Sequence, residues 1–131
     1  MTENPPYKLS ASIRDGIAEI VIEGELTREL IDRLRQDILA ILRGEKVAGV
    51  LCDVRAAKGP HDITEAYFRT RSLPSDIARL PLAVVDLSDR NFHSFYETTA
   101  FNTGQSIKFF ADVEAARAWL KSRIQKSHQA L

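Results

Sequence analysis

Apolar and polar residues alternate along the first ordered segment of the chain. From residue 7 to residue 14 every second position is apolar, in the order YKLSASIR. A period of two is typical of a strand with one buried face. The dipeptide Asp15-Gly16 follows, and it favours the two-residue turn of a hairpin because both turn positions need positive φ. A second strand is therefore predicted from Ala18 to Glu23, with Ile20 and Ile22 on its buried face.

After the hairpin the apolar spacing changes to three and four residues, which predicts an amphipathic helix. The apolar stripe of this helix consists of Leu30, Ile31, Leu34, Ile38, Ile41 and Leu42. Thr27 is expected to cap its first turn, because a threonine hydroxyl accepts a free amide proton there. Gly44 is expected to end it.

Two nearly continuous apolar runs, residues 47–54 and 82–87, predict strands that are covered on both faces. The first run is expected to end at Asp53, before a loop at residues 55–60. Further helices are predicted at residues 62–73, ended by Pro74, and at residues 92–100.

The clearest unit closes the chain, in the sequence IKFFADVEAARAWL from residue 107. A short strand leads to Asp112, a good N-cap, and a helix follows. The residues on its inner face are Val113, Ala116, Leu120 and Ile124, with Trp119 beside them. The predicted order is ββαβαβαβα: an α/β fold with a mixed five-stranded sheet, an N-terminal antiparallel hairpin and four main helices, in which the two covered strands are central.

Length and composition favour one domain. The chain has 131 residues, and we expect a flexible leader at 1–6, one domain at 7–126 and a frayed tail at 127–131. Eighteen basic and eighteen acidic residues cancel, which argues against nonspecific nucleic-acid binding. Cys52 is the only cysteine, so no disulfide forms within the chain. We expect no signal peptide, no transmembrane segment and a cytoplasmic location.

This order and four sequence stretches resemble the STAS superfamily, and most closely its bacterial SpoIIAA-like branch. The stretches are LSASIRDGIAEIVIEGELT, GVLCDVR, PLAVVDLSD and IKFFADVEAARAWL, and the resemblance extends from about Tyr7 to Lys121. It implies a SpoIIAA-like fold and a regulatory role through a protein partner. The branch is also similar to the lipid-binding CRAL-TRIO fold.

The chain departs from the STAS pattern at one position. Anti-sigma-factor antagonists of the family carry a phosphorylatable serine in a turn after the third strand. Here Asp53 is followed by VRAAKGPHD, which contains no serine, and Thr64 is the nearest hydroxyl. The phosphorylation switch of that family is therefore not expected here.

Charged residues at the ends of the covered strands form the first candidate site. Asp53 and Asp86 end these strands, where ligands bind in open α/β sheets. Arg55 and Arg90, with Lys58, are expected in the same region and could attract an anion. The alternative is that these side chains cap turns or are simply solvated.

Aromatic residues form the second candidate site. Phe92, Phe95, Tyr96 and Phe101 crowd one predicted helix, where they line a pocket, form a partner surface or fill the core. On the same helix His93 and Glu97 are four residues apart, a spacing that suits either a metal chelate or a simple surface pair. Cys52 lies in an apolar strand, where a buried thiol is unreactive.

No nucleophile–base pair or metal-ligand set has a diagnostic spacing, so we expect no enzyme and no cofactor. An enzyme would instead combine Asp53 or Asp86 with His61 or His93. The preferred hypothesis is a non-enzymatic STAS-like regulatory module that binds a protein partner. The alternative is a binder of a small apolar or lipid-like ligand. A homodimer through the hairpin edge or the aromatic helix is also expected.

Overall fold

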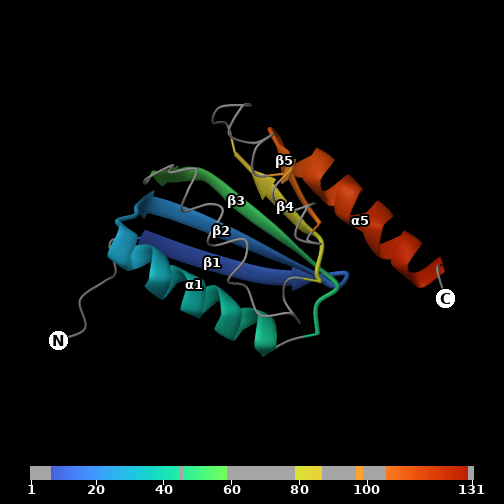
Figure 1. Cartoon of the computed structure of the whole chain (residues 1–131), viewed down its shortest axis with the longest axis horizontal. Coiled ribbons are helices and arrows are strands. Elements are labelled where there is room, and N and C mark those ends of the chain that lie inside the picture. The colour runs from blue at the N-terminus through green and yellow to red at the C-terminus, as the bar shows by residue number, and fades with distance from the viewer. Residues whose placement is uncertain (1–6, 45, 59–78, 87–96, 99–105, 130–131) are drawn as a thin grey trace.

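The computed structural model describes residues 7–44, 46–58, 79–86, 97–98 and 106–129. Their longer elements are five strands and two helices (Figure 1). In chain order these elements are β1 (Tyr7–Arg14), β2 (Ile17–Glu25), α1 (Arg28–Arg43), β3 (Gly49–Lys58), β4 (Leu82–Val85), β5 (Ile107–Phe110) and α5 (Val113–Gln129).

The strands form one mixed sheet in the order β1-β2-β3-β4-β5. β1 and β2 are antiparallel, whereas the later neighbours pair in parallel. The turn between β1 and β2 has φ of 55° at Asp15 and 79° at Gly16, as a type I′ turn requires. The predicted hairpin and the five-stranded mixed sheet are thus confirmed, and the two covered strands, β3 and β4, are both internal.

The helix count and the element order differ from the prediction. In the described part of the chain the two long helices are α1 and α5, and the order is ββαβββα. The predicted helix at 62–73 lies outside the described residues, and so does the helix at 92–100 except for positions 97 and 98.

The end of β3 was also predicted wrongly. Residues 55–58 continue the strand instead of forming a loop. β2 runs to Glu25, and its end pairs with this segment, so that Glu23 lies opposite Ala56. From the pair Val21–Asp53 to the pair Glu23–Ala56, β2 advances two positions and β3 three, so β3 contains a bulge just after Asp53.

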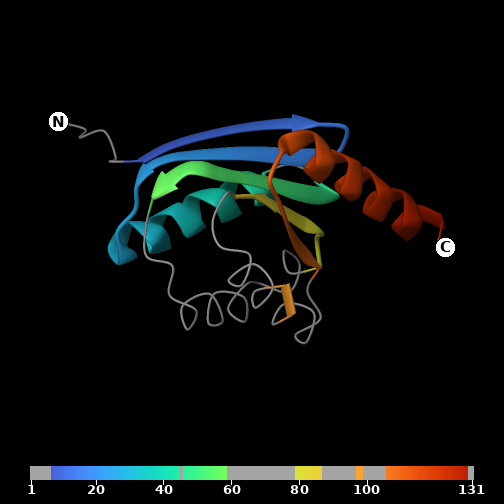
Figure 2. The same cartoon turned by 90° about the horizontal axis from the view of Figure 1, so that it is seen from above.

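The two helices cover opposite faces of the sheet (Figure 2). Since consecutive strand residues point to opposite sides, each strand contributes residues to the core on both faces. Below the face covered by α1 lies a core formed by Tyr7, Ala18, Ile20, Ile22, Leu34, Leu42 and Val50. The face covered by α5 has its own core, formed by Ile17, Leu51, Ala83, Val85, Ala116 and Leu120. α5 lies against β3, β4 and β5, and the β1 residues that point to the α5 side are exposed: Lys8, Ser10, Ser12 and Arg14.

Polar groups at the helix ends confirm the predicted caps. The Thr27 hydroxyl accepts the Leu30 N–H at 3.3 Å, and the Asp112 carboxylate accepts the Ala115 N–H at 2.8 Å. Gly44 ends α1 with right-handed φ and ψ, so its position there does not depend on positive φ. The buried Tyr7 hydroxyl donates to Asp37 at 2.7 Å and ties β1 to α1.

Candidate functional site

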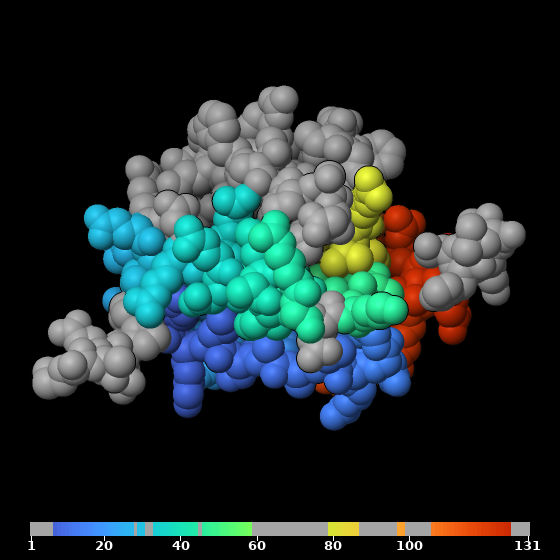
Figure 3. Space-filling view, turned by 90° about the horizontal axis from the view of Figure 1, so that it is seen from below, coloured from blue at the N-terminus to red at the C-terminus, as the bar shows by residue number. Residues whose placement is uncertain are grey.

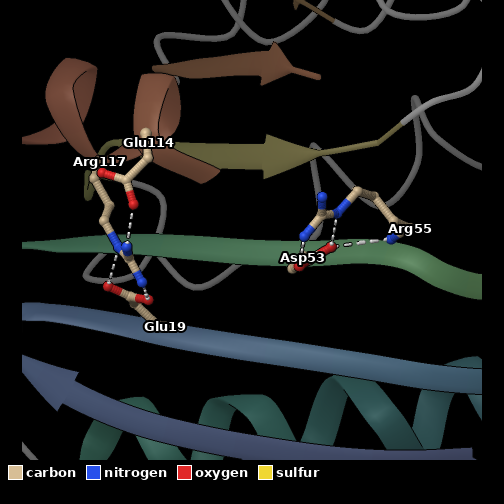
Figure 4. Close-up of polar contacts among 5 residues, drawn as sticks. All are labelled: Glu19, Asp53, Arg55, Glu114 and Arg117. Carbon is tan, nitrogen blue, oxygen red and sulfur yellow. Dashed lines mark hydrogen bonds and ion pairs between the residues drawn. The ribbon is translucent and has the colours of Figure 1, made fainter. Parts of the chain in front are cut away.

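Asp53 and Arg55 form a bidentate ion pair at the bulge of β3 (Figure 4). The Arg55 guanidinium donates to both carboxylate oxygens of Asp53, through Nε at 3.0 Å and an Nη at 2.8 Å. The Arg55 backbone N–H donates to the same carboxylate at 3.2 Å. Asp53 precedes the bulge and Arg55 follows within it, so their hydrogen bonds link the strand across the irregularity.

This pairing sets the protonation state of Asp53. The hydrogen bond from Arg55 holds the pKa of the Asp53 carboxyl below its ordinary value, although partial burial acts in the opposite direction. The carboxylate is therefore ionised at neutral pH and already neutralised by its partner. An acid–base catalyst would need a pKa near the working pH, which this environment does not provide.

The other predicted site residues fall into two groups. Asp86 follows β4, and its backbone N–H donates to Phe110 at 2.9 Å, but the residue opposite Asp53 in β4 is Val85. The strand ends are thus adjacent, as expected, while the two carboxylates are not in register. The remaining predicted site residues lie outside the described part of the chain, and their roles stay predictions: Thr64, Arg90, Phe92, Phe95 and Tyr96.

A second charged network, which the sequence analysis missed, joins β2 to α5 (Figure 4). Arg117 donates to both Glu19 oxygens, through Nε at 2.8 Å and an Nη at 2.7 Å. Its other Nη donates to Glu114 at 2.7 Å. The hydrogen bond from Arg117 lowers the pKa of Glu19, and the charges of Arg14 and Lys121 lower it further. No local signal could have revealed this pair, because 98 residues separate its partners.

The lowered pKa values of Glu19 and Asp53 predict that the folded protein loses stability in acid. A carboxyl whose pKa is lower in the folded protein contributes stability above its unfolded pKa, and the contribution is lost as the pH falls through the folded value. Glu19 has an ordinary value of 4.5 and Asp53 one of 3.8. We expect Glu19→Gln to be less stable than wild type at pH 7, and the difference in unfolding free energy to shrink below pH 4.5.

Urea unfolding at stepped pH values between 7 and 3 measures this difference. Glu114→Gln is the matched control, because the Glu114 side chain is 83% exposed and contacts the same arginine. It should change stability less than Glu19→Gln does. A gap between wild type and Glu19→Gln that is equally large at pH 7 and pH 3 would contradict the assignment.

Of the proposed chelating pair, His93 and Glu97, the structure describes only Glu97. The Glu97 carboxylate accepts the Phe109 backbone N–H at 2.9 Å, and this contact occupies a donor of β5. His93 is outside the described residues. Among the residues that are described, no cluster of three or more metal-ligating side chains occurs.

Cys52 packs on the α1 side of β3, at the margin of the apolar core. Removal of the sulfur from water raises the pKa of the thiol to about 12. The thiol is therefore protonated at neutral pH and a poor nucleophile, in agreement with the prediction of an unreactive cysteine.

In the described sheet β1 is an edge strand, and most of it is exposed. β1 is the first strand in the sheet order, and six of its eight residues are exposed. Its hairpin forms a continuous rim of the molecule beside α1 (Figure 3). Sequence analysis predicted this strand from its alternation, but that alternation does not show that the strand is at the edge of the sheet.

In the part of the chain that the structure describes, no helix is long and apolar enough to cross a bilayer. No protein-family profile matches the sequence, and no curated protein matches it either. Solved structures do match.

One similar structure is an uncharacterised protein of the DUF3478 family from Shewanella loihica PV-4, which has a SpoIIAA-like fold. It is 18% identical, with a TM-score of 0.58 over 92% of this chain and 98% of that one. Another is an anti-sigma factor antagonist from Mycobacterium paratuberculosis, 14% identical, with a TM-score of 0.60 over 88% of this chain and 94% of that one. With its hairpin-led mixed sheet, this protein has a SpoIIAA-like fold.

Proposed function

We propose that the protein is a non-enzymatic regulatory module that acts in the cytoplasm by binding a protein partner. The observation that carries this proposal is the exposed, eight-residue edge strand β1. An edge strand of this length offers main-chain donors and acceptors to another chain, and proteins commonly use such edges for recognition.

Two further observations support a binding role. Two partly buried carboxylates, Asp53 and Glu19, are each held by an arginine and stay ionised. The fold is also shared with a protein named as an anti-sigma factor antagonist. A fold alone does not determine a function, so this likeness adds to the argument from β1 and does not replace it.

Native mass spectrometry of the protein purified from its own host tests the proposal. We expect a protein partner in stoichiometric amount. The alternative, a lipid-like ligand, depended on the similarity to the CRAL-TRIO fold and on four aromatic residues outside the described part of the chain: Phe92, Phe95, Tyr96 and Phe101. A co-purifying lipid with no protein partner would overturn the proposal.

A further inference from the structure

The two edges of the sheet differ in how they are protected. β5 has four residues, and the Glu97 carboxylate occupies the Phe109 N–H. β1 has eight residues, and no described strand pairs with its outer side. A short strand, cover by another part of the chain and charged side chains each protect a sheet edge from strand addition. β5 is short and covered at the Phe109 N–H, whereas β1 is long and its protection among the described residues consists of the charges of Lys8 and Arg14.

The hairpin register determines which main-chain groups of β1 point outward. Arg14 and Ile17 close the two-residue turn, and such a closing pair exchanges both of its hydrogen bonds. Because hydrogen-bonded and non-bonded pairs alternate, Ser12, Ser10 and Lys8 also bond to β2. Their neighbours, Leu9, Ala11 and Ile13, therefore direct their N–H and C=O groups away from the sheet.

The side chains of β1 form two different rows along this edge. On the α1 side the apolar row is incompletely covered, since Ala11 is exposed and Ile13 is 38% exposed. The opposite row is exposed throughout and reads Lys8, Ser10, Ser12, Arg14. A strand added beside β1 would thus meet apolar residues on one face, and hydroxyls between two cations on the other.

We propose that β1 binds an extended segment of a protein partner as a sixth strand, with apolar residues facing the α1 side and acidic residues opposite Lys8 and Arg14. This inference rests on the proposed function and names the chemistry of the partner. Opposite charges that face each other across neighbouring strands stabilise pairing, and like charges oppose it.

The positive charges of Lys8 and Arg14 favour an acidic partner strand over the β1 strand of a second copy of the chain. In a full-length antiparallel pairing of two β1 strands, Lys8 of each copy lies opposite Arg14 of the other. Lys8 has Glu23 opposite it in β2, so the less balanced charge of the row is that of Arg14. Near Arg14, the carboxylate of Glu19 is held by Arg117, so it is only partly available to balance Arg14.

The test uses a labelled peptide, VEVTVTVEV, in which valines alternate with polar residues and the two glutamates match the spacing of Lys8 and Arg14. VKVTVTVKV is its matched control. In fluorescence anisotropy at low salt we expect the acidic peptide to bind about tenfold more tightly, since two cross-strand charge pairs change from attractive to repulsive between the two peptides. Equal affinity for both peptides, or binding of neither, would overturn the inference.

Charge reversal provides a second readout. The double variant Lys8→Glu/Arg14→Glu should prefer the basic peptide. Lys126→Glu, the same reversal on the exposed side of α5, should keep the preference of wild type. Loss of the preference in Lys126→Glu as well would place the peptide elsewhere and contradict the assignment to β1.

Ala11→Pro tests the main-chain contribution. Proline has no N–H, and at position 11 the lost N–H points outward, so the ladder to β2 is kept. We expect at least about tenfold weaker peptide binding with an unchanged circular dichroism spectrum. In wild type, amide exchange of Leu9, Ala11 and Ile13 should slow when the peptide binds. This measurement decides the matter if Ala11→Pro fails to fold.

The remaining outcomes separate this inference from the proposed function. If a stoichiometric protein partner from the host binds Ala11→Pro and the charge-reversed variant as well as wild type, the β1 site is wrong and the proposed function stands. If no protein partner is found, the proposed function itself fails. A concentration-dependent dimer that protects the same three amides without peptide would show that the occupant is a second copy, and would overturn the acidic partner.

Discussion

Replacing Leu120 with alanine is expected to lower the free energy of unfolding by about 3 kcal/mol, within the range of large-to-small core substitutions. Leu120 is fully buried between α5 and the sheet, in the core that includes Leu51 and Val85. Its removal takes apolar surface from this core and leaves a cavity that the strands cannot collapse to fill.

Urea unfolding followed by circular dichroism measures this loss. Ser122→Ala is the matched control, because Ser122 is exposed on the same helix, and it should change stability by less than about 0.5 kcal/mol. A loss below about 1 kcal/mol for Leu120→Ala would contradict the close packing of α5 on the sheet.

Gly49→Ala is the second substitution with a large expected effect. A Cβ atom at position 49 would lie 3.2 Å from a Leu120 methyl carbon, 3.4 Å from one of Ile124 and 3.5 Å from Cγ of Pro81. Overpacking of this kind costs about 1–3 kcal/mol. The smaller gain from restricting the unfolded chain, about 0.4–1 kcal/mol, does not offset it. We therefore expect a net loss of about 1 kcal/mol.

The same substitution behaves differently when Leu120 is already alanine. The nearest atom is then absent, and the added methyl group occupies part of the cavity. In this background Gly49→Ala should be neutral or stabilising, which corresponds to a coupling of about 1 kcal/mol or more in a double-mutant cycle. Additive effects of the two substitutions would show that α5 does not approach β3 at Gly49.

Local features of the fold could be predicted because their causes lie within a few residues. The Asp15-Gly16 turn, the Thr27 and Asp112 caps and the apolar face of α5 each depend on neighbouring positions and agree with the structure. The continuous apolar character of β3 and β4 similarly indicated strands buried inside the sheet.

The extent of β3 was misjudged for a physical reason. Residues 55–58 read as a charged loop, but the end of β2 pairs with them, and the Asp53–Arg55 pair links the strand across the bulge. Main-chain pairing with a distant segment overrode the local preference. The same pairing changed Arg55 from a candidate anion ligand into the partner of Asp53.

By itself, the sequence determined the hairpin, the two capped helices that the structure describes and the buried strands, because periodicity, turn chemistry and caps act over short distances. Only the tertiary structure decided which charges meet and which edge is open. Glu19 and Arg117 pair across 98 residues, and the alternating row of β1 became an exposed edge only because the sheet order places that strand outermost. Such contacts depend on how the whole chain closes on itself, and no short stretch of sequence contains that information.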